Sequence, residues 1–344
     1  MPDPRYSCPM RPDFIPTTTH KRDEFSETVS GHLEGAPERK LVLRKLDGVP
    51  VWAKPIAAFL ARKEVRSLRV VTGITGTPEL IRVDEEGILR SWSEGIPLNL
   101  AKPDDAAFYK DAKRILREMR ARGVTHNDLA KPQNWLQAPD GRAAVIDFQL
   151  ASVHRRRGKL FRLMGYEDLR HLVKQKGRYA RHLLTPTERR MLQRKSLPTR
   201  IWMATGKKLY NAVTRGLFNW SDSEGSGNRI AQEGAAIRAE LMAHEGVRDV
   251  ILCAFALPAK GTGIYAFAET DLDPKALRAL VPESRVELIQ PVATLPRADL
   301  AELIAMNRLD ELEIVLQREP ELRDTVAPIV AGRLNLTDRR LAGI

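Results

Sequence analysis

One loop and the hairpin after it constrain the fold of this chain more than any other part of its sequence. Residues 126–134 read HNDLAKPQN and follow a predicted helix over 104–122, in which apolar residues recur at helical spacing. A hairpin with a Pro-Asp-Gly turn is predicted over residues 135–148. Because a hairpin pairs its two strands, Asn134 at its start and Asp147 at its end are expected to lie side by side.

The residue types at these positions suit phosphoryl transfer. An amide oxygen from Asn134 and a carboxylate oxygen from Asp147 are ligands that Mg²⁺ accepts while water and substrate phosphates fill its other positions. Asp128 is then free to orient a nucleophilic hydroxyl group. Phosphoryl transfer depends mostly on such positioning and on charge neutralisation. The pattern therefore predicts that Asn134 and Asp147 hold Mg²⁺ and that Asp128 is catalytic.

The same residues resemble the protein-kinase-like superfamily. Residues 126–128 (HND) match its H-R-D catalytic loop, 131–134 (KPQN) match the K-P-E-N continuation, and 147–149 (DFQ) match D-F-G. The resemblance implies an α+β, bilobal protein-kinase-like domain that binds ATP and Mg²⁺. It also implies that Asp128 and Lys131 are the catalytic residues.

Further elements upstream follow in the order of that family. A VWAK sequence ending at Lys54 resembles its V-A-I-K strand, so Lys54 is expected to anchor the ATP phosphates. Glu64 resembles the glutamate that pairs with and orients that lysine. Residues 91–95 resemble the hinge that receives adenine, with Trp92 and Glu94 as the expected contacts.

The sequence departs from the family pattern at several positions. Ala130 is an extra residue in the catalytic loop, and Gln149 replaces the D-F-G glycine, which removes a permissive φ angle. No G-x-G-x-x-G precedes the expected lysine strand, so only Gly31 and Gly35 are available for a phosphate-covering loop. The A-P-E motif is missing as well. The spacing is closer to the RIO-type and lipopolysaccharide-core kinases, which the chain resembles over residues 26–180.

The order of predicted elements and the composition divide the chain into five segments. Within the kinase-like domain, hairpins are predicted over 41–54, with an Asp-Gly turn, and over 80–92, with a helix over 56–68 between them. The expected segments are a disordered tail (1–25), the protein-kinase-like domain (26–220), a linker (221–228), a small α/β domain (229–319) and a C-terminal tail (320–344).

The small α/β domain resembles the C-terminal domain of acyl-CoA synthetases. It reads as helix, strand, strand, and carries a Leu-Pro-Arg sequence at 295–297. The Gly-Lys pair of that family would fall near Ala301 and Glu302, so the adenylation lysine is missing. The resemblance therefore implies a binding or regulatory module without ligase activity.

The positive charge of the chain is local. The chain has 56 Lys and Arg and 44 Asp and Glu, a net charge of +12. Residues 151–220 alone hold 18 Lys and Arg against three acidic residues, a net +15, so the rest of the chain carries −3. An acceptor that docks on this stretch is expected to be anionic. No recognised nucleic-acid module is present, so no specific nucleic-acid partner is expected.

Residues 199–220 form a basic amphipathic stretch with Trp202 and Trp220 near its ends. Such a helix can lie on an anionic membrane surface. It can also pack its apolar stripe on its own domain and leave the basic face in water. Both interpretations stay open.

Composition excludes several classes of protein. No run approaches the ~20 apolar residues of a membrane span, and the N-terminus lacks the apolar core of a signal peptide. Two cysteines are too few for a disulfide framework or a Cys-rich zinc site. A cytoplasmic location is expected, with peripheral attachment to the inner membrane surface as its extension if 199–220 binds lipid.

The expected function is an ATP- and Mg²⁺-dependent kinase of the serine/threonine-protein-kinase-like type. It would transfer the γ-phosphoryl group to a hydroxyl of a protein Ser or Thr, or to a lipid or saccharide hydroxyl. The alternative is a pseudokinase-type regulatory or membrane-surface scaffold that binds nucleotide without transfer. Gln149 and the extra Ala130 motivate that alternative.

Overall fold

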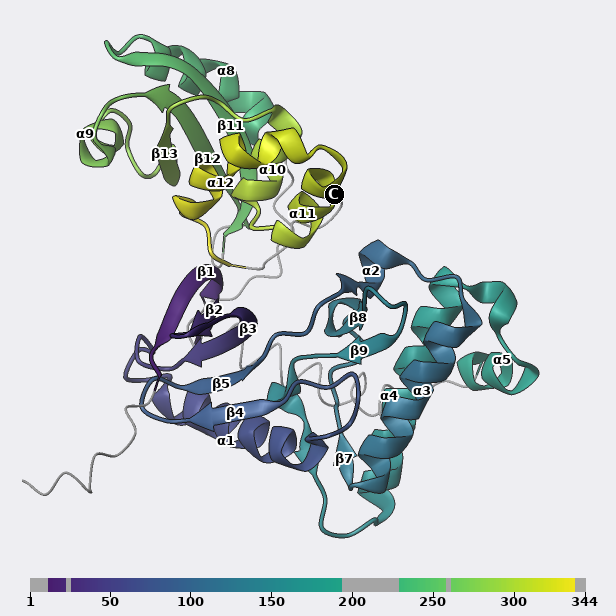
Figure 1. Ribbon diagram of the computed structural model, residues 1–344. Helices are drawn as coiled ribbons and strands as arrows, with labels where there is room; N and C mark the ends of the chain where they lie inside the picture. The colour runs from purple at the N-terminus through teal and green to yellow at the C-terminus, as the bar shows by residue number, and fades with distance from the viewer. Residues whose placement is uncertain (1–11, 23–25, 194–228, 258–260, 338–344) are drawn as a thin grey trace, which may run out of the picture. The chain divides into compact units, whose positions relative to one another are not determined.

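The computed structural model describes residues 12–22, 26–193, 229–257 and 261–337 (Figure 1). The chain divides into two compact units, Met1–Ser196 and Leu197–Ile344. Among the described residues, the first unit holds helices and three small sheets and the second unit holds helices and one sheet, which confirms the α+β class. The predicted basic helix over 199–220 and the predicted linker over 221–228 lie outside the described residues.

The first unit begins with a five-stranded antiparallel sheet of strand order β1-β2-β3-β5-β4. The 18-residue helix α1, Lys54–Val71, packs below it in Figure 1. The prediction that residues 1–25 are a disordered tail is wrong for β1, which pairs with β2 through backbone hydrogen bonds and needs no apolar pattern of its own. The strands are β1 (Phe14–Arg22), β2 (Glu27–Leu33), β3 (Ala36–Lys45), β4 (Leu80–Val83) and β5 (Ile88–Ser91).

The predicted hairpin over 80–92 is confirmed as β4 and β5, but the one over 41–54 is wrong. Strand β3 pairs with β2 and β5, and the chain after it turns and enters α1. Two prolines explain the difference. Pro55 occupies the first turn of α1, where its fixed φ favours helix initiation, and the Pro50 carbonyl accepts the N–H groups of Ala53 and Lys54 at 2.9 and 3.1 Å.

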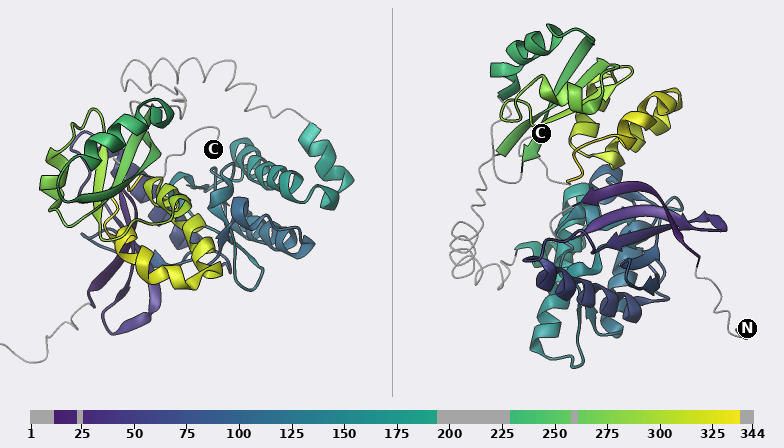
Figure 2. Two further views of the ribbon diagram at one scale, coloured as in Figure 1. Left: turned by 90° about the horizontal axis from the view of Figure 1, so that it is seen from above. Right: turned by 90° about the vertical axis from the view of Figure 1, so that its left-hand side faces the viewer.

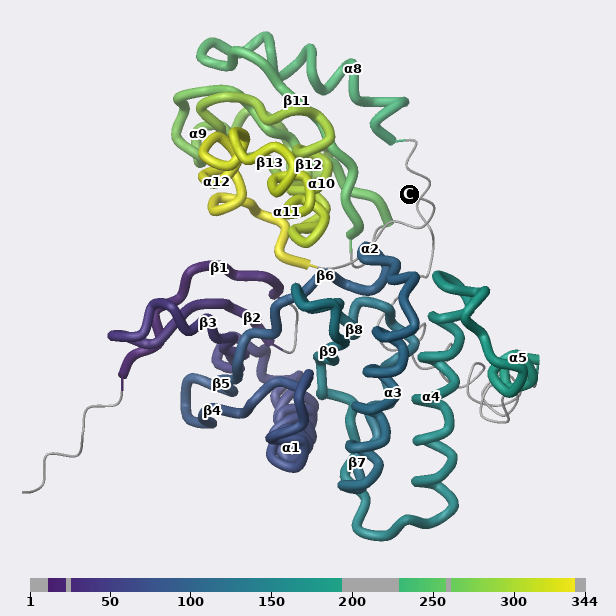
Figure 3. The backbone as a smooth tube through the Cα atoms, turned by 45° about the vertical axis from the view of Figure 1, so that its right-hand side comes forward, coloured from purple at the N-terminus to yellow at the C-terminus, as the bar shows by residue number. Residues whose placement is uncertain are grey.

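The rest of the first unit is mainly helical. Helices α3 and α4 run side by side (Figures 1 and 3), next to a three-stranded sheet of order β6-β8-β9. Strand β7 pairs with β10. The elements are β6 (Ile96–Pro97), α2 (Leu98–Ala101), α3 (Ala106–Ala121), β7 (Val124–Thr125), β8 (Trp135–Gln137), β9 (Ala143–Val145), β10 (Ser152–Val153), α4 (Lys159–Tyr179) and α5 (Pro186–Gln193), with 3₁₀ turns η2 (Pro132–Asn134), η3 (Phe148–Leu150) and η4 (Arg181–Leu183).

The predicted helix over 104–122 and hairpin over 135–148 are confirmed as α3 and as β8 with β9. Asp105 caps α3 by accepting the Ala107 N–H at 3.0 Å. One apolar core joins α1, α3 and the β8–β9 hairpin. Its largest members include Leu68, Tyr109, Trp135 and Phe148.

A buried carboxylate joins three helices of this unit. Glu188 of α5 pairs with Lys113 of α3 and, at 3.0 Å, with Lys176 of α4. Glu188 also completes a capping box. Its carboxylate accepts the Thr185 N–H at 2.8 Å, and the Thr185 hydroxyl accepts the backbone N–H of Glu188 at 3.3 Å. Burial acts to raise the pKa of Glu188, but the hydrogen bonds from Lys113, Thr185 and Lys176 together lower it to about 2.

The second unit is a three-stranded sheet with helices on both faces (Figure 2). Strand β12 pairs with β11 antiparallel and with β13 parallel. Alternate residues of β11 and β12 face α8 and α9 on one side and α10, α11 and α12 on the other. The elements are α8 (Arg229–Met242), β11 (Val247–Leu257), β12 (Gly261–Thr270), α9 (Pro274–Ala279), β13 (Leu288–Val292), α10 (Ala298–Ala305), α11 (Leu309–Arg318), η6 (Pro320–Leu322) and α12 (Arg323–Ala331).

The predicted helix, strand, strand order at the start of this unit is confirmed. The prediction of a C-terminal tail over 320–344 is wrong for α12, because Val326 and Ile329 are buried in the core beneath the sheet. In the part of the chain that the structure describes, no helix is both long enough and apolar enough to cross a membrane.

We expect the helices α3, α4 and α5 to lose stability in acid through Glu188. Its pKa lies below the ordinary 4.5, so its ionised form stabilises the fold above pH 4.5, and this contribution disappears as the pH falls towards 2. Glu188→Gln should therefore destabilise these helices at pH 7 and much less near pH 3. Urea unfolding read by hydrogen exchange in peptides of α3–α5 measures this. The exposed Glu38→Gln is the control, and a difference that does not depend on pH would contradict the assignment.

Candidate functional site

The loop over 126–134 is held in place by a carboxylate from helix α4. Asp168, 4% exposed, accepts the backbone N–H of His126 at 2.7 Å and that of Asn127 at 2.9 Å, one on each oxygen. Asn127 has a φ of 69°, a left-handed conformation that asparagine tolerates better than most residues. Burial raises the pKa of Asp168, whereas the charge of His126 and the two N–H groups act to lower it. Sequence reasoning did not find this residue.

A second contact from α4 accommodates the extra residue of the loop. The Gln175 side chain donates to the Ala130 carbonyl at 2.9 Å. The backbone carbonyl at the position where the sequence departs from the expected pattern is therefore hydrogen-bonded.

The side chain of His126 connects the loop to the end of β9. Its Nε2 donates to the Ile146 carbonyl at 2.9 Å, and its ring lies 4.9 Å from that of Phe148. Both rings are buried. The two segments that carry Asp128 and Asp147 are thus fixed to each other through a hydrogen bond and an aromatic contact.

Asp128, Lys131 and Asn134 form one cluster. The Asn134 Nδ2 donates to the Asp128 carbonyl at 2.8 Å and to its carboxylate at 3.1 Å. The Lys131 ammonium lies 2.9 Å from the same carboxylate, and its side chain is 60% exposed. Because Asn134 uses its nitrogen on Asp128, its amide oxygen stays available to a ligand on the other side.

Asp147 follows β9 in a left-handed conformation with a φ of 67°. The Ile146 N–H donates to the Asn134 carbonyl at 2.9 Å. Asp147 is the next residue in the chain after Ile146. The Asp147 Oδ1 is buried and accepts no hydrogen bond from any described residue. A buried acceptor without a partner costs about 1–3 kcal/mol, and a bound cation would satisfy it.

The Asp147 carboxylate and the Asn134 amide oxygen are of the ligand type that Mg²⁺ accepts. Among the described residues, no group of three or more His, Cys, Asp or Glu side chains could hold a metal ion. Asp147 and the amide oxygen of Asn134 would supply two ligands, and water and substrate phosphates would supply the others.

The departure at Gln149 does not strain the backbone. Gln149 lies in the 3₁₀ turn η3 and has no positive φ, so this position does not require glycine. The left-handed residue of the segment is Asp147.

The predicted pairing of Glu64 with Lys54 is wrong. Lys54 is the exposed first residue of α1, because the expected strand at 51–54 does not form. Glu64 binds Arg44 of β3 at 2.5 Å, with both side chains 1% exposed, and Arg90 of β5 lies 3.6 Å from its other oxygen. Arg44 follows the apolar run 41–43 on its strand, but no local pattern of the sequence marks it as the partner of Glu64.

Helix α1 also contacts the segment that follows Asp147. The Lys63 ammonium donates to the Leu150 carbonyl at 3.1 Å. Glu64 and Lys63 are neighbours, so α1 is bonded to β3 through one and to η3 through the other.

The predicted adenine contacts lie on the connection from β5 to β6. The backbone N–H of Trp92 donates to the Lys40 carbonyl at 3.2 Å. The Lys40 ammonium lies 4.0 Å from the centre of the Trp92 ring. Glu94 is exposed. No hydrogen bond or ion pair joins either of them to Asp128 or Asp147 within the described residues. Gly35, a candidate for the phosphate-covering loop, lies in the turn between the paired strands β2 and β3 and has a φ of 79°.

We expect Glu64→Gln to destabilise the first unit by about 3 kcal/mol, because it leaves the Arg44 guanidinium buried without an anion. Lys54→Gln should change the stability by less than about 0.5 kcal/mol, as expected for an exposed side chain. Urea unfolding of both variants measures the difference. Equal effects of the two substitutions would contradict the assignment of Arg44 as the partner of Glu64.

We expect Asp168→Asn to loosen the loop over 126–134, since an amide NH₂ group would face a backbone N–H that the carboxylate now binds. The cost should be about 2–3 kcal/mol, with faster hydrogen exchange at His126 and Asn127. Glu167→Gln, at the adjacent position of α4, is the control. Unchanged exchange in the Asp168 variant would show that the loop is held by other contacts.

Comparison with known proteins does not assign this chain to a family. No protein-family model matches it, and no curated protein matches it at a significant level. The functional assignment therefore depends on the geometry of the site.

Proposed function

We propose that the chain is an ATP- and Mg²⁺-dependent kinase with a bilobal, protein-kinase-like first unit. The observation that carries the proposal is the arrangement of two carboxylates. Asp128 is held by Asn134 and Lys131, and Asp147 presents a buried oxygen without a partner next to them. One carboxylate is thus positioned and hydrogen-bonded, whereas the other needs a cation.

Each residue of the cluster has a separate part in the proposed reaction. Asp128 orients the acceptor hydroxyl and accepts its proton as the hydroxyl oxygen attacks the γ-phosphorus, whose bond to the β–γ bridging oxygen breaks so that ADP leaves. Lys131 is exposed enough to reach the transferred phosphoryl group and balance its charge. Asn134 and Asp147 would hold Mg²⁺, which supplies charge neutralisation on the phosphates when bound. Asp168 positions the loop and acts only through it.

On the nucleotide side, the basic residue that pairs with Glu64 differs from the one expected from the sequence. Arg44 on β3 takes the part that was expected for Lys54 on a strand over 51–54, and Glu64 keeps its place on the helix. Arginine in this position keeps the ion pair between strand and helix but offers a planar, permanently charged group in place of an ammonium. Adenine is proposed to lie at 91–95. Glu94 is the better contact there, because the Trp92 N–H already binds Lys40.

The proposed acceptor class rests on the chemistry of Asp128 and on the charge of residues 151–220. A hydroxyl of a protein Ser or Thr, or of a lipid or saccharide, suits Asp128 equally. The surplus of Lys and Arg in 151–220 favours an anionic acceptor. The second unit is proposed as a binding or regulatory module, on its resemblance to the C-terminal domain of acyl-CoA synthetases.

The test is phosphoryl transfer from labelled ATP with Mg²⁺ to whole-cell protein and lipid extracts by the full chain. Asp128→Asn should lower transfer at least 100-fold, the usual loss of a general base, while a thermal shift with Mg-ATP persists. Asp147→Asn should abolish the Mg²⁺ dependence of that shift. The exposed Asp140→Asn is the control for both variants. A thermal shift without any transfer by the wild-type chain would favour the nucleotide-binding scaffold instead.

A further inference from the structure

Strand β11 forms one edge of the three-stranded sheet in the second unit (Figure 1). It is 11 residues long and, among the described strands, it pairs only with β12. A strand at a sheet edge presents a row of backbone N–H and C=O groups that can pair with another strand. The free side of β11 is therefore the part of this unit that can accept a further strand.

Two side-chain contacts show which residues of β11 turn their backbone groups to the free edge. The Val250 N–H donates to the Asp249 carboxylate at 2.7 Å, and Arg238 of α8 donates to the Val250 carbonyl at 3.2 Å. Val250 thus uses both groups away from β12. Because the direction of these groups alternates along a strand, the next residues to face the free edge are Leu252, Ala254 and Ala256.

The partner strand β12 has the same alternation. Ile264 lies opposite Ala254, and its N–H donates at 2.7 Å to Glu287, on the side away from β11. Two residues directly opposite in an antiparallel pair turn their backbone groups either both towards each other or both away. The groups of Ala254 therefore point away from β12. Among the described residues, none binds the backbone groups of Leu252, Ala254 or Ala256.

The sequence of this edge does not protect it from pairing. Natural edge strands are protected by charged residues, proline, bulges or short length. Residues 250–257 (VILCAFAL) contain no charge and no proline, and the register shift of β11 lies before them, between Val247 and Asp249. The edge is closed at Val250 by its own side-chain contacts. It is open from Leu252 onwards, where Leu252 and Ala254 are partly exposed.

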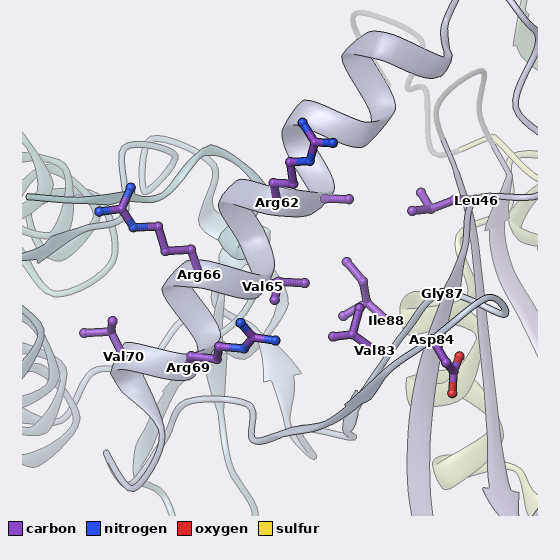
Figure 4. Close-up of a pocket in the computed structure, with 11 residues that line it drawn as sticks. Leu46, Arg62, Val65, Arg66, Arg69, Val70, Val83, Asp84, Gly87 and Ile88 are labelled. Carbon is purple, nitrogen blue, oxygen red and sulfur yellow. The ribbon is translucent and has the colours of Figure 1, made fainter.

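The other edge strands of the larger sheets carry such devices. β1 contains Pro16 and two register shifts, β13 contains Pro291, and β6 and β9 have only two and three residues. β4 has four residues with a register shift after Leu80, and Val83 at its end lies across a cavity from Val65 of helix α1 (Figure 4). In the part of the chain that the structure describes, β11 is the long edge strand that remains open.

We propose that the free edge of β11 is a dimer interface, to which β11 of a second copy of this chain adds antiparallel. The open stretch over 252–256 is centred on Ala254. A two-fold axis at Ala254 therefore pairs Leu252 with Ala256 of the partner subunit, and the two sheets become one continuous sheet. Such a contact uses the same patch on both copies and closes on itself. It does not depend on phosphoryl transfer by the first unit.

The side chains of β11 favour a second copy over an unrelated strand. Leu252 belongs to the apolar core on the α8 side of the sheet, and Cys253 and Phe255 belong to the core on the α10 side. A strand that extends both cores must be apolar on both faces. β11 itself has this property, since residues 250–257 are apolar throughout. The small side chain of Ala254 at the axis lets the two strands approach to pairing distance.

The test is sedimentation velocity of the full chain between about 1 and about 100 μM. We expect a reversible monomer–dimer equilibrium. Ala254→Pro should weaken dimerisation at least tenfold, because proline removes the N–H that faces the partner. The β11–β12 ladder should survive, since that N–H takes no part in it, and an unchanged far-UV circular dichroism spectrum would verify this. Ala254→Ser keeps the N–H and is the matched control, which should dimerise like the wild type.

Hydrogen exchange of the wild-type chain gives a second readout that needs no variant. Exchange in peptides over 250–257 should slow as the concentration rises, whereas exchange over 262–270 should not change, because β12 is already paired on both sides. Dimerisation of Ala254→Pro as tight as that of Ala254→Ser would overturn the proposal. A wild-type chain that stays monomeric would overturn it as well. Slow exchange over 250–257 in that monomer would assign the edge to the chain's own residues, and fast exchange would leave it to a strand of another protein.

Discussion

The arrangement of the candidate site depends on one buried carboxylate. The backbone of the loop over 126–134 turns through a left-handed residue at Asn127, so two successive N–H groups point inward with no strand to pair with. Asp168 accepts both of them. A buried charge of this kind is costly, as the raised pKa of Asp168 indicates, and the two hydrogen bonds offset that cost. Because the loop is fixed at His126 and Asn127, the side chain of Asp128 emerges in a defined direction.

The distribution of acidic residues in the basic stretch over 151–220 follows the same logic. Residues 151–220 hold only three acidic residues among 18 basic ones. Two of the three, Asp168 and Glu188, are buried and bind groups on other elements. Acidic residues that interrupt a strongly basic stretch therefore serve here as internal anchors. Their rarity is a signal that the sequence contains, and it limits the candidates to Glu167, Asp168 and Glu188.

The parts of the fold that were predictable are those set by neighbouring residues. Hairpins with a short turn signal, at 80–92 and 135–148, formed as expected because their strands pair with the next segment of the chain. The hairpin expected over 41–54 failed because Pro55 starts a helix where a second strand was needed. Strand β1 was missed because its polar sequence has no period-two apolar pattern. Its pairing with β2 is supplied by backbone groups, which leave no trace in side-chain composition.

The sequence by itself determined which residues meet in the loop and hairpin, since the positions of Asp128, Asn134 and Asp147 follow from one turn and one short hairpin. Only the tertiary structure decided which cation faces Glu64. Lys54 is ten residues away along the same helix and cannot fold back to it, whereas Arg44 on β3 lies directly across the buried interface between sheet and helix. A buried carboxylate must be paired by a group that reaches it, and reach depends on how strand and helix pack, which no local pattern specifies.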